Sequence, residues 1–167
     1  ALAPPSAVQH HAPARGSQLE RLGRCGPRGS GHLQRMIYLD PSALAKLVVE
    51  EAESDALAAW LDDHEDEVLF TSALSEVGLV RAAVRRPPET MPAALALIAE
   101  LSLVPVDATI VDLAWSLGPA ALRSMDALQL ASALSVVGDA VNFDAYDTRL
   151  LEAASASGLT AMAPGAE

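Results

Sequence analysis

Four acidic residues occupy equivalent places in the sequence, just after an apolar run or in the first turns of the helical stretch that follows one. They are Asp40, Glu76, Asp126 and Asp147, with Asp144 as a further acid beside the last of them. In open parallel α/β sheets, functional groups gather in the crevice outside the carboxyl ends of the strands. We therefore expect these carboxylates to converge at one edge of a sheet.

Carboxylates that converge repel one another, and a divalent cation between them offsets that repulsion. Neither His nor Cys accompanies this set. Ligation by oxygen alone favours hard ions, so we expect Mg²⁺, with Mn²⁺ as the alternative. Each acid also has a simpler interpretation, as a helix cap or first-turn acid for the three Asp residues and as a solvent-facing residue for Glu76. The occurrence of all four together favours the metal site.

The elements that would position these acids alternate along the chain from Met36 onward. Short strands that alternate with helices predict an α/β fold, a three-layer α/β/α sandwich with a short, mainly parallel sheet. Apolar runs predict strands at 37–39, 68–70, 103–106, 141–143 and 159–162. Helical spacing predicts helices at 42–50, 53–62, 92–101 and 107–117, one capped by Thr71 or Ser72 that runs to Arg86, one capped by Ser124 that runs to Val137, and one capped by Asp147 that runs to Ser157.

The composition excludes several classes of protein. The 167 residues are 51% hydrophobic, which excludes a disordered chain, and a single cysteine excludes a disulfide scaffold. No apolar stretch approaches the roughly 20 residues of a membrane span. The net charge is -11, so the overall field does not attract nucleic acid. A nucleic-acid partner would need a bound cation or a few well-placed arginines.

The first 35 residues differ from the rest. They hold five arginines against one glutamate and half of the ten glycines, without helical or strand periodicity. We expect residues 1–35 to be a disordered basic extension, translated from a start codon upstream of Met36, and residues 36–164 to form the folded domain. A basic arm for nucleic acid is the alternative. The sequence has no secretory signal, no pair of cysteines and no membrane span, so we expect a cytoplasmic protein.

Four segments contain the candidate acids with their neighbours: 37–47 (IYLDPSALAKL), 71–77 (TSALSEV), 122–131 (LRSMDALQLA) and 146–154 (YDTRLLEAA). They resemble the acidic motifs of PIN-domain ribonucleases, specifically the VapC-type toxins of bacterial toxin–antitoxin pairs. The resemblance covers about residues 36–164, in the family's order and spacing. Two positions depart from the family pattern, since Pro41 stands where Thr or Ser usually follows the first Asp, and Ala145 stands where a hydroxyl is common.

The resemblance implies a PIN-like fold and a Mg²⁺-dependent endoribonuclease that hydrolyses RNA phosphodiester bonds as the toxin of a toxin–antitoxin pair. The implied partners are an RNA substrate and a cognate antitoxin protein, and we also expect a homodimer and no membrane association. The resemblance implies catalytic and metal-binding roles for Asp40, Glu76, Asp126 and Asp147, with Ser42, Arg123 and Asp144 as supporting residues.

Several alternatives stay open from the sequence. An inactive PIN-fold module that only binds protein is the second interpretation of the chain, and Ala145 is the one residue that favours it. Either Asp144 or Asp147 could be the fourth acid. Arg81, Arg85 and Arg86 could contact phosphates or could simply complement a helix dipole. An apolar groove for an antitoxin helix could form from Leu44, Leu47, Leu57 and Trp60, which could equally be core residues.

Overall fold

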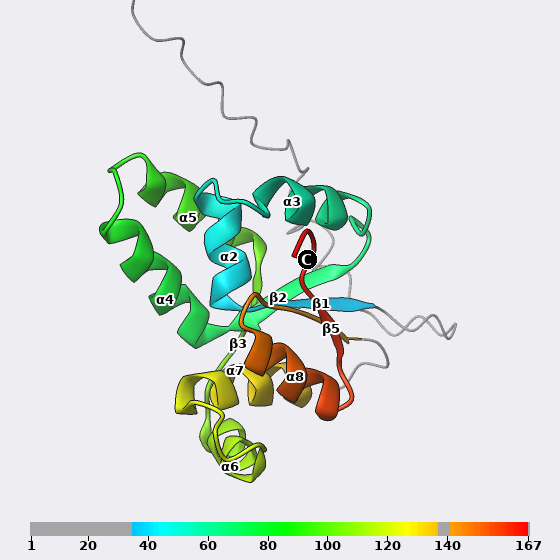
Figure 1. Ribbon diagram of the computed structural model, residues 1–167. Helices are drawn as coiled ribbons and strands as arrows, with labels where there is room; N and C mark the ends of the chain where they lie inside the picture. Colours follow the sequence, from blue (N-terminus) through cyan, green and yellow to red (C-terminus); the bar gives the residue numbers. More distant parts are fainter. Residues whose placement is uncertain (1–34, 137–140, 167) are drawn as a thin grey trace, which may run out of the picture.

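The computed structural model of the chain describes residues 35–136 and 141–166. A parallel sheet of five strands, in the order β3-β2-β1-β4-β5, forms its centre (Figure 1). The expected α/β fold is therefore confirmed. The strands are β1 (Met36–Leu39), β2 (Val68–Ser72), β3 (Ser102–Val104), β4 (Val141–Asp144) and β5 (Thr160–Met162).

Helices cover both faces of the sheet and complete the three layers. In Figure 1, α2 to α5 lie on one side of the sheet, and α6, α7 and α8 lie on the other side. The helices are α2 (Pro41–Val48), α3 (Ser54–Asp62), α4 (Ala73–Val84), α5 (Thr90–Glu100), α6 (Ala108–Ser116), α7 (Ser124–Ser135) and α8 (Thr148–Ala156).

The register of the sheet brings the ends of its strands to one edge. Leu39, the last residue of β1, pairs with Asp144, the last residue of β4. On the other side of β1, Tyr38 pairs with Phe70 of β2. Because the strands are parallel, the segments that follow β1, β2 and β4 all leave the sheet at this carboxyl edge.

The core has two parts because successive side chains of a strand point to opposite faces. Ile37 and Leu39 pack with the layer of α2 and α3, whereas Tyr38 packs with the layer of α7 and α8. The Tyr38 ring stacks on Phe143 with 5.0 Å between ring centroids and meets Phe70 edge-on at 5.2 Å. These aromatic contacts join β1 to both of its neighbouring strands.

Part of the groove that the sequence offered for an antitoxin helix is absent. Leu44 and Leu57 are fully buried in the core, whereas Leu47 and Trp60 are partly buried and pack against it. The groove prediction is therefore wrong for Leu44 and Leu57. These two side chains face the sheet because α2 and α3 must bury one apolar stripe each to cover it.

The helix boundaries follow the sequence closely, with small corrections. The N-cap of α7 is Arg123 rather than Ser124, and no side-chain hydrogen bond caps this helix. Helix α5 begins at Thr90, so Pro92 lies within its first turn, where proline is tolerated.

Within the part of the chain that the structure describes, no helix combines the length and apolarity needed to cross a bilayer. The predicted extension 1–35 lies, apart from Arg35, outside the described residues.

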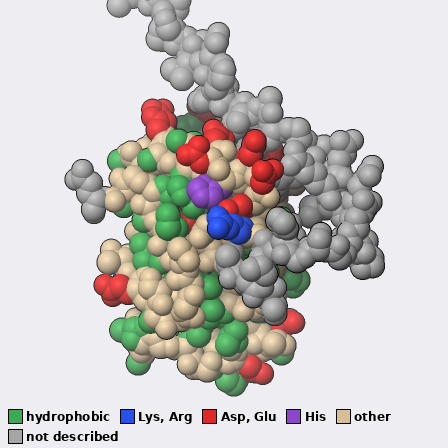
Figure 2. Space-filling view, turned by 90° about the vertical axis from the view of Figure 1, so that its right-hand side faces the viewer, with side chains coloured by type: hydrophobic (Ala, Val, Ile, Leu, Met, Phe, Trp, Pro, Cys, Tyr) green, Lys and Arg blue, Asp and Glu red, His purple; other side chains and the backbone are tan. Residues whose placement is uncertain are grey.

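Acidic side chains also gather away from the carboxyl edge of the sheet. The segment 62–67 joins α3 to β2 and carries exposed acids on the side where the strands begin. Figure 2 views the molecule from this side and shows acidic side chains gathered in its upper part. This group is remote from the carboxyl ends of the strands, and Glu67, the last acid of the segment, is buried.

Candidate functional site

Asp40 is the central acid of the site. It directly follows β1 and caps α2, and it is only 7% exposed. Its Oδ2 atom accepts hydrogen bonds from the backbone N–H of Ser42 at 3.0 Å and from the Ser42 hydroxyl at 2.6 Å. Burial, with a smaller contribution from the charges of Asp126 and Asp147, outweighs these hydrogen bonds and raises the pKa of Asp40 to about 6.

Ser42 connects Asp40 to the loop that carries the last acid. While its hydroxyl donates to Asp40, its Oγ atom accepts a hydrogen bond of 3.0 Å from the backbone N–H of Tyr146. Tyr146 directly precedes Asp147. The supporting residue that the sequence singled out therefore lies between the ends of β1 and β4, and it bonds to both.

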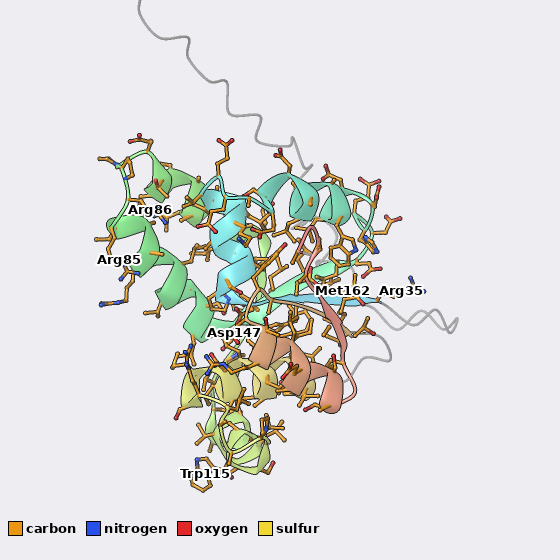
Figure 3. The ribbon with its side chains drawn as sticks, in the orientation of Figure 1. Arg35, Arg85, Arg86, Trp115, Asp147 and Met162 are labelled. Atoms are coloured by element: carbon orange, nitrogen blue, oxygen red, sulfur yellow. The ribbon has the colours of Figure 1, made fainter. Side chains whose placement is uncertain are left out.

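Asp147 lies at the edge of the sheet, near the start of α8 (Figure 3). Its Oδ1 atom accepts hydrogen bonds from the backbone N–H groups of Arg149 at 3.0 Å and Leu150 at 3.3 Å, so it caps α8. Its Oδ2 atom lies 3.8 Å from a guanidinium nitrogen of Arg123 and 3.7 Å from one of Arg149. Partial burial acts to raise the pKa of Asp147, but the hydrogen bonds and the two arginines outweigh it, and the pKa is lowered.

Asp126 belongs to the same electrostatic group. It lies half-buried in the first turn of α7. Burial and then the charge of Asp147 raise its pKa, against the opposing effect of Arg123 and Arg149. Asp40, Asp126 and Asp147 thus form a group of three carboxylates that interact electrostatically, which we call the acidic cluster.

Glu76 comes to the same edge from another element. It lies in the first turn of α4, and Ser72, the last residue of β2, caps this helix through a 3.3 Å bond from the Leu74 N–H. The Glu76 side chain is exposed and forms no hydrogen bond or ion pair with another described residue. Its role as a fourth ligand stays a prediction.

The carboxylate of Asp144 does not interact with the acidic cluster, although its backbone carbonyl accepts a 2.9 Å hydrogen bond from the Asp40 N–H. It is fully buried, and neither of its carboxylate oxygens has a hydrogen-bond partner in the described part of the chain. Burial raises its pKa to about 8, and the neighbouring charge is Glu67 rather than any acid of the cluster. Of the two candidates for the last acid, Asp147 is therefore the one that interacts with Asp40 and Asp126.

The donor atoms of this region suit a hard cation that keeps part of its water shell. All of them are carboxylate or hydroxyl oxygens, and the carboxylates disfavour one another's charge, which a cation would reverse. Among residues 35–136 and 141–166, however, no three or more His, Cys, Asp or Glu side chains stand close enough together to enclose an ion directly. A hard cation in this region would therefore be bound partly through water, a mode that Mg²⁺ tolerates.

Two arginines border the acidic cluster and two others do not. Arg123 and Arg149 both approach the Oδ2 atom of Asp147. Arg85 and Arg86 lie at the far end of α4 from Asp147 (Figure 3), and Arg86 is 3.9 Å from Glu51. Sequence reasoning missed Arg149, although its position two residues after a helix-capping acid is a usable signal.

Comparison with known proteins identifies relatives over most of the chain. Residues 37–155 match the PIN domain family. Ribonuclease VapC35 of Mycobacterium tuberculosis is 46% identical over 132 residues, which cover 78% of this chain and 98% of the relative. Ribonuclease VapC47 of the same species is 38% identical over 135 residues, with 78% and 98% covered. Ribonuclease VapC46 is 38% identical over 128 residues, with 77% and 97% covered.

Proposed function

Since the chain belongs to the PIN-domain family of VapC ribonucleases, we propose that it hydrolyses RNA phosphodiester bonds at the acidic cluster, as the toxin of a toxin–antitoxin pair. The observation that carries this proposal is the electrostatic interaction among Asp40, Asp126 and Asp147, which come from three separate elements of the fold. Burial, and to a smaller extent neighbouring acids, raises the pKa of Asp40 and Asp126, and perturbed pKa values of this kind are typical of functional sites.

We assign Asp40, Glu76, Asp126 and Asp147 to the metal, directly or through water, and we propose Mg²⁺, with Mn²⁺ as a substitute. When bound, such an ion polarises the phosphate, lowers the pKa of a water molecule and stabilises the leaving oxygen. The protein's own part is to hold ionised carboxylates in place. Ser42 serves this purpose because its hydrogen bonds favour the charged form of Asp40.

Arg123 and Arg149 have two proposed tasks. They offset the negative charge around Asp147, and they offer guanidinium groups to the phosphates of an RNA strand. The second task is needed because residues 36–167 hold six basic against 21 acidic residues and would otherwise repel RNA. Both arginine side chains are more than half exposed, so they are accessible to a substrate.

The proposed protein partner is a cognate antitoxin that inhibits the nuclease, in the cytoplasm, where the RNA substrate is found. An arginine of the antitoxin directed at the acidic cluster would form charge-assisted hydrogen bonds with its carboxylates and compete with the metal. We further propose a homodimer. Its support is Trp115, which is 80% exposed and lines a pocket of about 390 Å³ together with Val111, Leu117 and Leu122.

The test is RNA cleavage by the purified chain, with Mg²⁺ and with a chelator. We expect cleavage that the chelator abolishes, and a loss of at least about 100-fold in Asp126→Asn, which keeps the size of the side chain but removes a ligand charge. Asp55→Asn is the matched control, because Asp55 is an exposed acid on α3 outside the site. Cleavage by Asp126→Asn at the level of the control would reject the assignment, and a folded wild type without any cleavage would favour the inactive binding module.

A further inference from the structure

A group of buried polar side chains connects the elements that carry the acids. Its members are Tyr38 of β1, Thr71 of β2, Ser75 of α4 and Gln129 of α7, and none of them is more than 3% exposed. We call them the buried polar group. Polar groups at such depth are costly unless they are hydrogen-bonded, so the partners of each member show what holds it there.

Gln129 is the centre of the group. Its Oε1 atom accepts a short hydrogen bond from the Tyr38 hydroxyl and a second one of 3.1 Å from the Ser75 hydroxyl. The Tyr38 oxygen in turn accepts a 3.3 Å hydrogen bond from the backbone N–H of Ser72. One carbonyl oxygen on α7 therefore binds a strand residue and a residue of α4, which lie 91 and 54 positions away in the sequence.

Thr71 extends the group to the backbone of β1. Its Oγ1 atom lies 2.6 Å from the carbonyl oxygen of Leu39 and 2.7 Å from the Ser75 hydroxyl. The Leu39 carbonyl belongs to the peptide group that leads into Asp40. The buried polar group therefore fixes the end of β1 relative to the end of β2 and the start of α4.

Three of the four members stand within three residues of a proposed metal-binding acid, namely Tyr38 near Asp40, Ser75 near Glu76 and Gln129 near Asp126. Gln129 follows Asp126 by three residues, so the two lie on the same side of α7. Ser75 directly precedes Glu76. The buried polar group therefore holds the backbone next to three acids. It bonds the Leu39 carbonyl one residue before Asp40, it includes Ser75 one residue before Glu76, and it includes Gln129 one helical turn after Asp126.

We propose that the buried polar group, with Gln129 at its centre, positions Asp40, Glu76 and Asp126 for metal binding and cleavage. This inference rests on the proposed function, because it assigns a task to residues beneath the same site. Gln129, Tyr38, Thr71 and Ser75 touch neither metal nor substrate, so they are positioning residues.

The physical reason lies in the directionality of hydrogen bonds. An apolar contact between α7 and the sheet would tolerate small rotations and shifts of the helix, whereas two bonds to one carbonyl oxygen restrict both. A shift of about 1 Å in a catalytic group can reduce a rate by about 100-fold. Replacing both partners of a buried hydrogen bond by apolar side chains of the same shape can cost little stability, so stability alone does not require this group.

The experiment compares Gln129→Met and Tyr38→Phe with the wild type. Methionine keeps the length of the side chain but offers no carbonyl acceptor, and phenylalanine keeps the ring that stacks on Phe143. Leu130→Val is the matched control, because Leu130 is the next residue on α7, fully buried and outside the group. All variants are measured at a temperature at which circular dichroism shows them folded, and Tyr38→Phe serves if Gln129→Met fails to fold.

Two quantities are measured, namely the kcat and KM of RNA cleavage and the Kd of Mn²⁺ by electron paramagnetic resonance. We expect Gln129→Met to lower kcat by about 10-fold to 100-fold with KM changed less than about threefold, and to weaken Mn²⁺ binding several-fold. Tyr38→Phe should change the same quantities in the same direction, and Leu130→Val should leave them within about twofold.

A kcat and a Mn²⁺ Kd near the wild-type values in both variants, or an equal loss in Leu130→Val, would overturn the proposal. A wild type that binds Mn²⁺ without cleaving RNA would count against the proposed function alone, and the Mn²⁺ measurement would still decide the positioning role.

Discussion

Asp40 shows how one residue can serve structure and chemistry together. Its Oδ2 atom accepts two hydrogen bonds from Ser42, which is what a helix N-cap requires. The same burial that makes this cap strong raises the pKa of Asp40 to about 6. The carboxyl group is therefore mostly ionised at pH 7 but lies closer to protonation than an exposed aspartate, so its charge responds to a neighbouring cation.

Asp144 gives the clearest pH dependence at the scale of a single residue. Its folded-state pKa of about 8 lies above the unfolded value near 3.8, so its contribution to stability is complete below about pH 4 and is lost as the pH rises through about 8. Between pH 5 and 8 the free energy of unfolding should fall by up to about 1.4 kcal/mol per pH unit from this group. Urea unfolding at several pH values measures this slope.

The variant Asp144→Asn removes the titrating group, so its unfolding free energy should fall less steeply over the same pH range. Asp112→Asn, which changes an exposed acid of α6, is the control and should keep the wild-type slope. Equal slopes in the wild type and Asp144→Asn would show that Asp144 titrates in its ordinary range.

At the scale of elements, the site depends on how strands end and helices begin. Asp40, Ser72 and Asp147 each end a strand or loop and cap the next helix. The sequence predicted these caps because Asp and Ser are strong N-cap residues and because each follows an apolar run. It could not predict that Arg123 is the N-cap residue of α7, because the local preference favours Ser124.

Residue pairs that are distant in the sequence could not be predicted. The bonds from Tyr38 and Ser75 to Gln129 join positions on separate elements, and they form only once the sheet and α7 are packed. Periodicity likewise did not decide whether Leu44 and Leu57 are buried, because a helix of eight or nine residues has an apolar stripe in either case. Local sequence signals predicted the helices, the strands and the candidate acids. The bonds to Gln129 and the burial of Leu44 and Leu57 depend on tertiary packing, which local signals do not contain.

The link between α2 and the loop before α8 can be tested through Ser42. The change Ser42→Ala removes the hydroxyl that bonds Asp40 at 2.6 Å and Tyr146 at 3.0 Å. We expect a loss of about 1–2 kcal/mol in unfolding free energy and a loss of about 10-fold in RNA cleavage, because a buried carboxylate loses a donor. Ser116→Ala is the control, because its hydroxyl bonds the Leu113 carbonyl on the exposed side of α6. Cleavage by Ser42→Ala equal to that of the control would exclude a role for the link.

At the scale of the whole molecule, charge is distributed unevenly. Of the six basic residues in 36–167, Lys46 is engaged by Glu51 at 3.0 Å and Glu53 at 2.6 Å. Arg123 and Arg149 lie at the acidic cluster instead, where an RNA strand would need them. An acidic protein can therefore bind RNA through a small local site with a metal, and its overall field disfavours binding elsewhere.

The domain division remains a prediction and can be tested by truncation. A chain that begins at Met36 should unfold at the same temperature as the full chain, within about 2 °C, and should cleave RNA at the same rate. The reason is that residues 1–35 have no periodicity that could contribute to the core. Thermal unfolding and a cleavage assay on both chains measure this, and weaker RNA binding by the short chain would favour the basic arm.

A calorimetric titration of Mn²⁺ into the wild type, Asp40→Asn and Asp126→Asn shows directly whether the acidic cluster binds the metal on which RNA cleavage depends. The titration is run at pH 7, where Asp40 is mostly ionised. We predict saturable binding to the wild type, and binding at least about 10-fold weaker in each variant, because each loses a ligand charge. Binding of equal strength in all three folded proteins, or no binding to the wild type, would contradict the account.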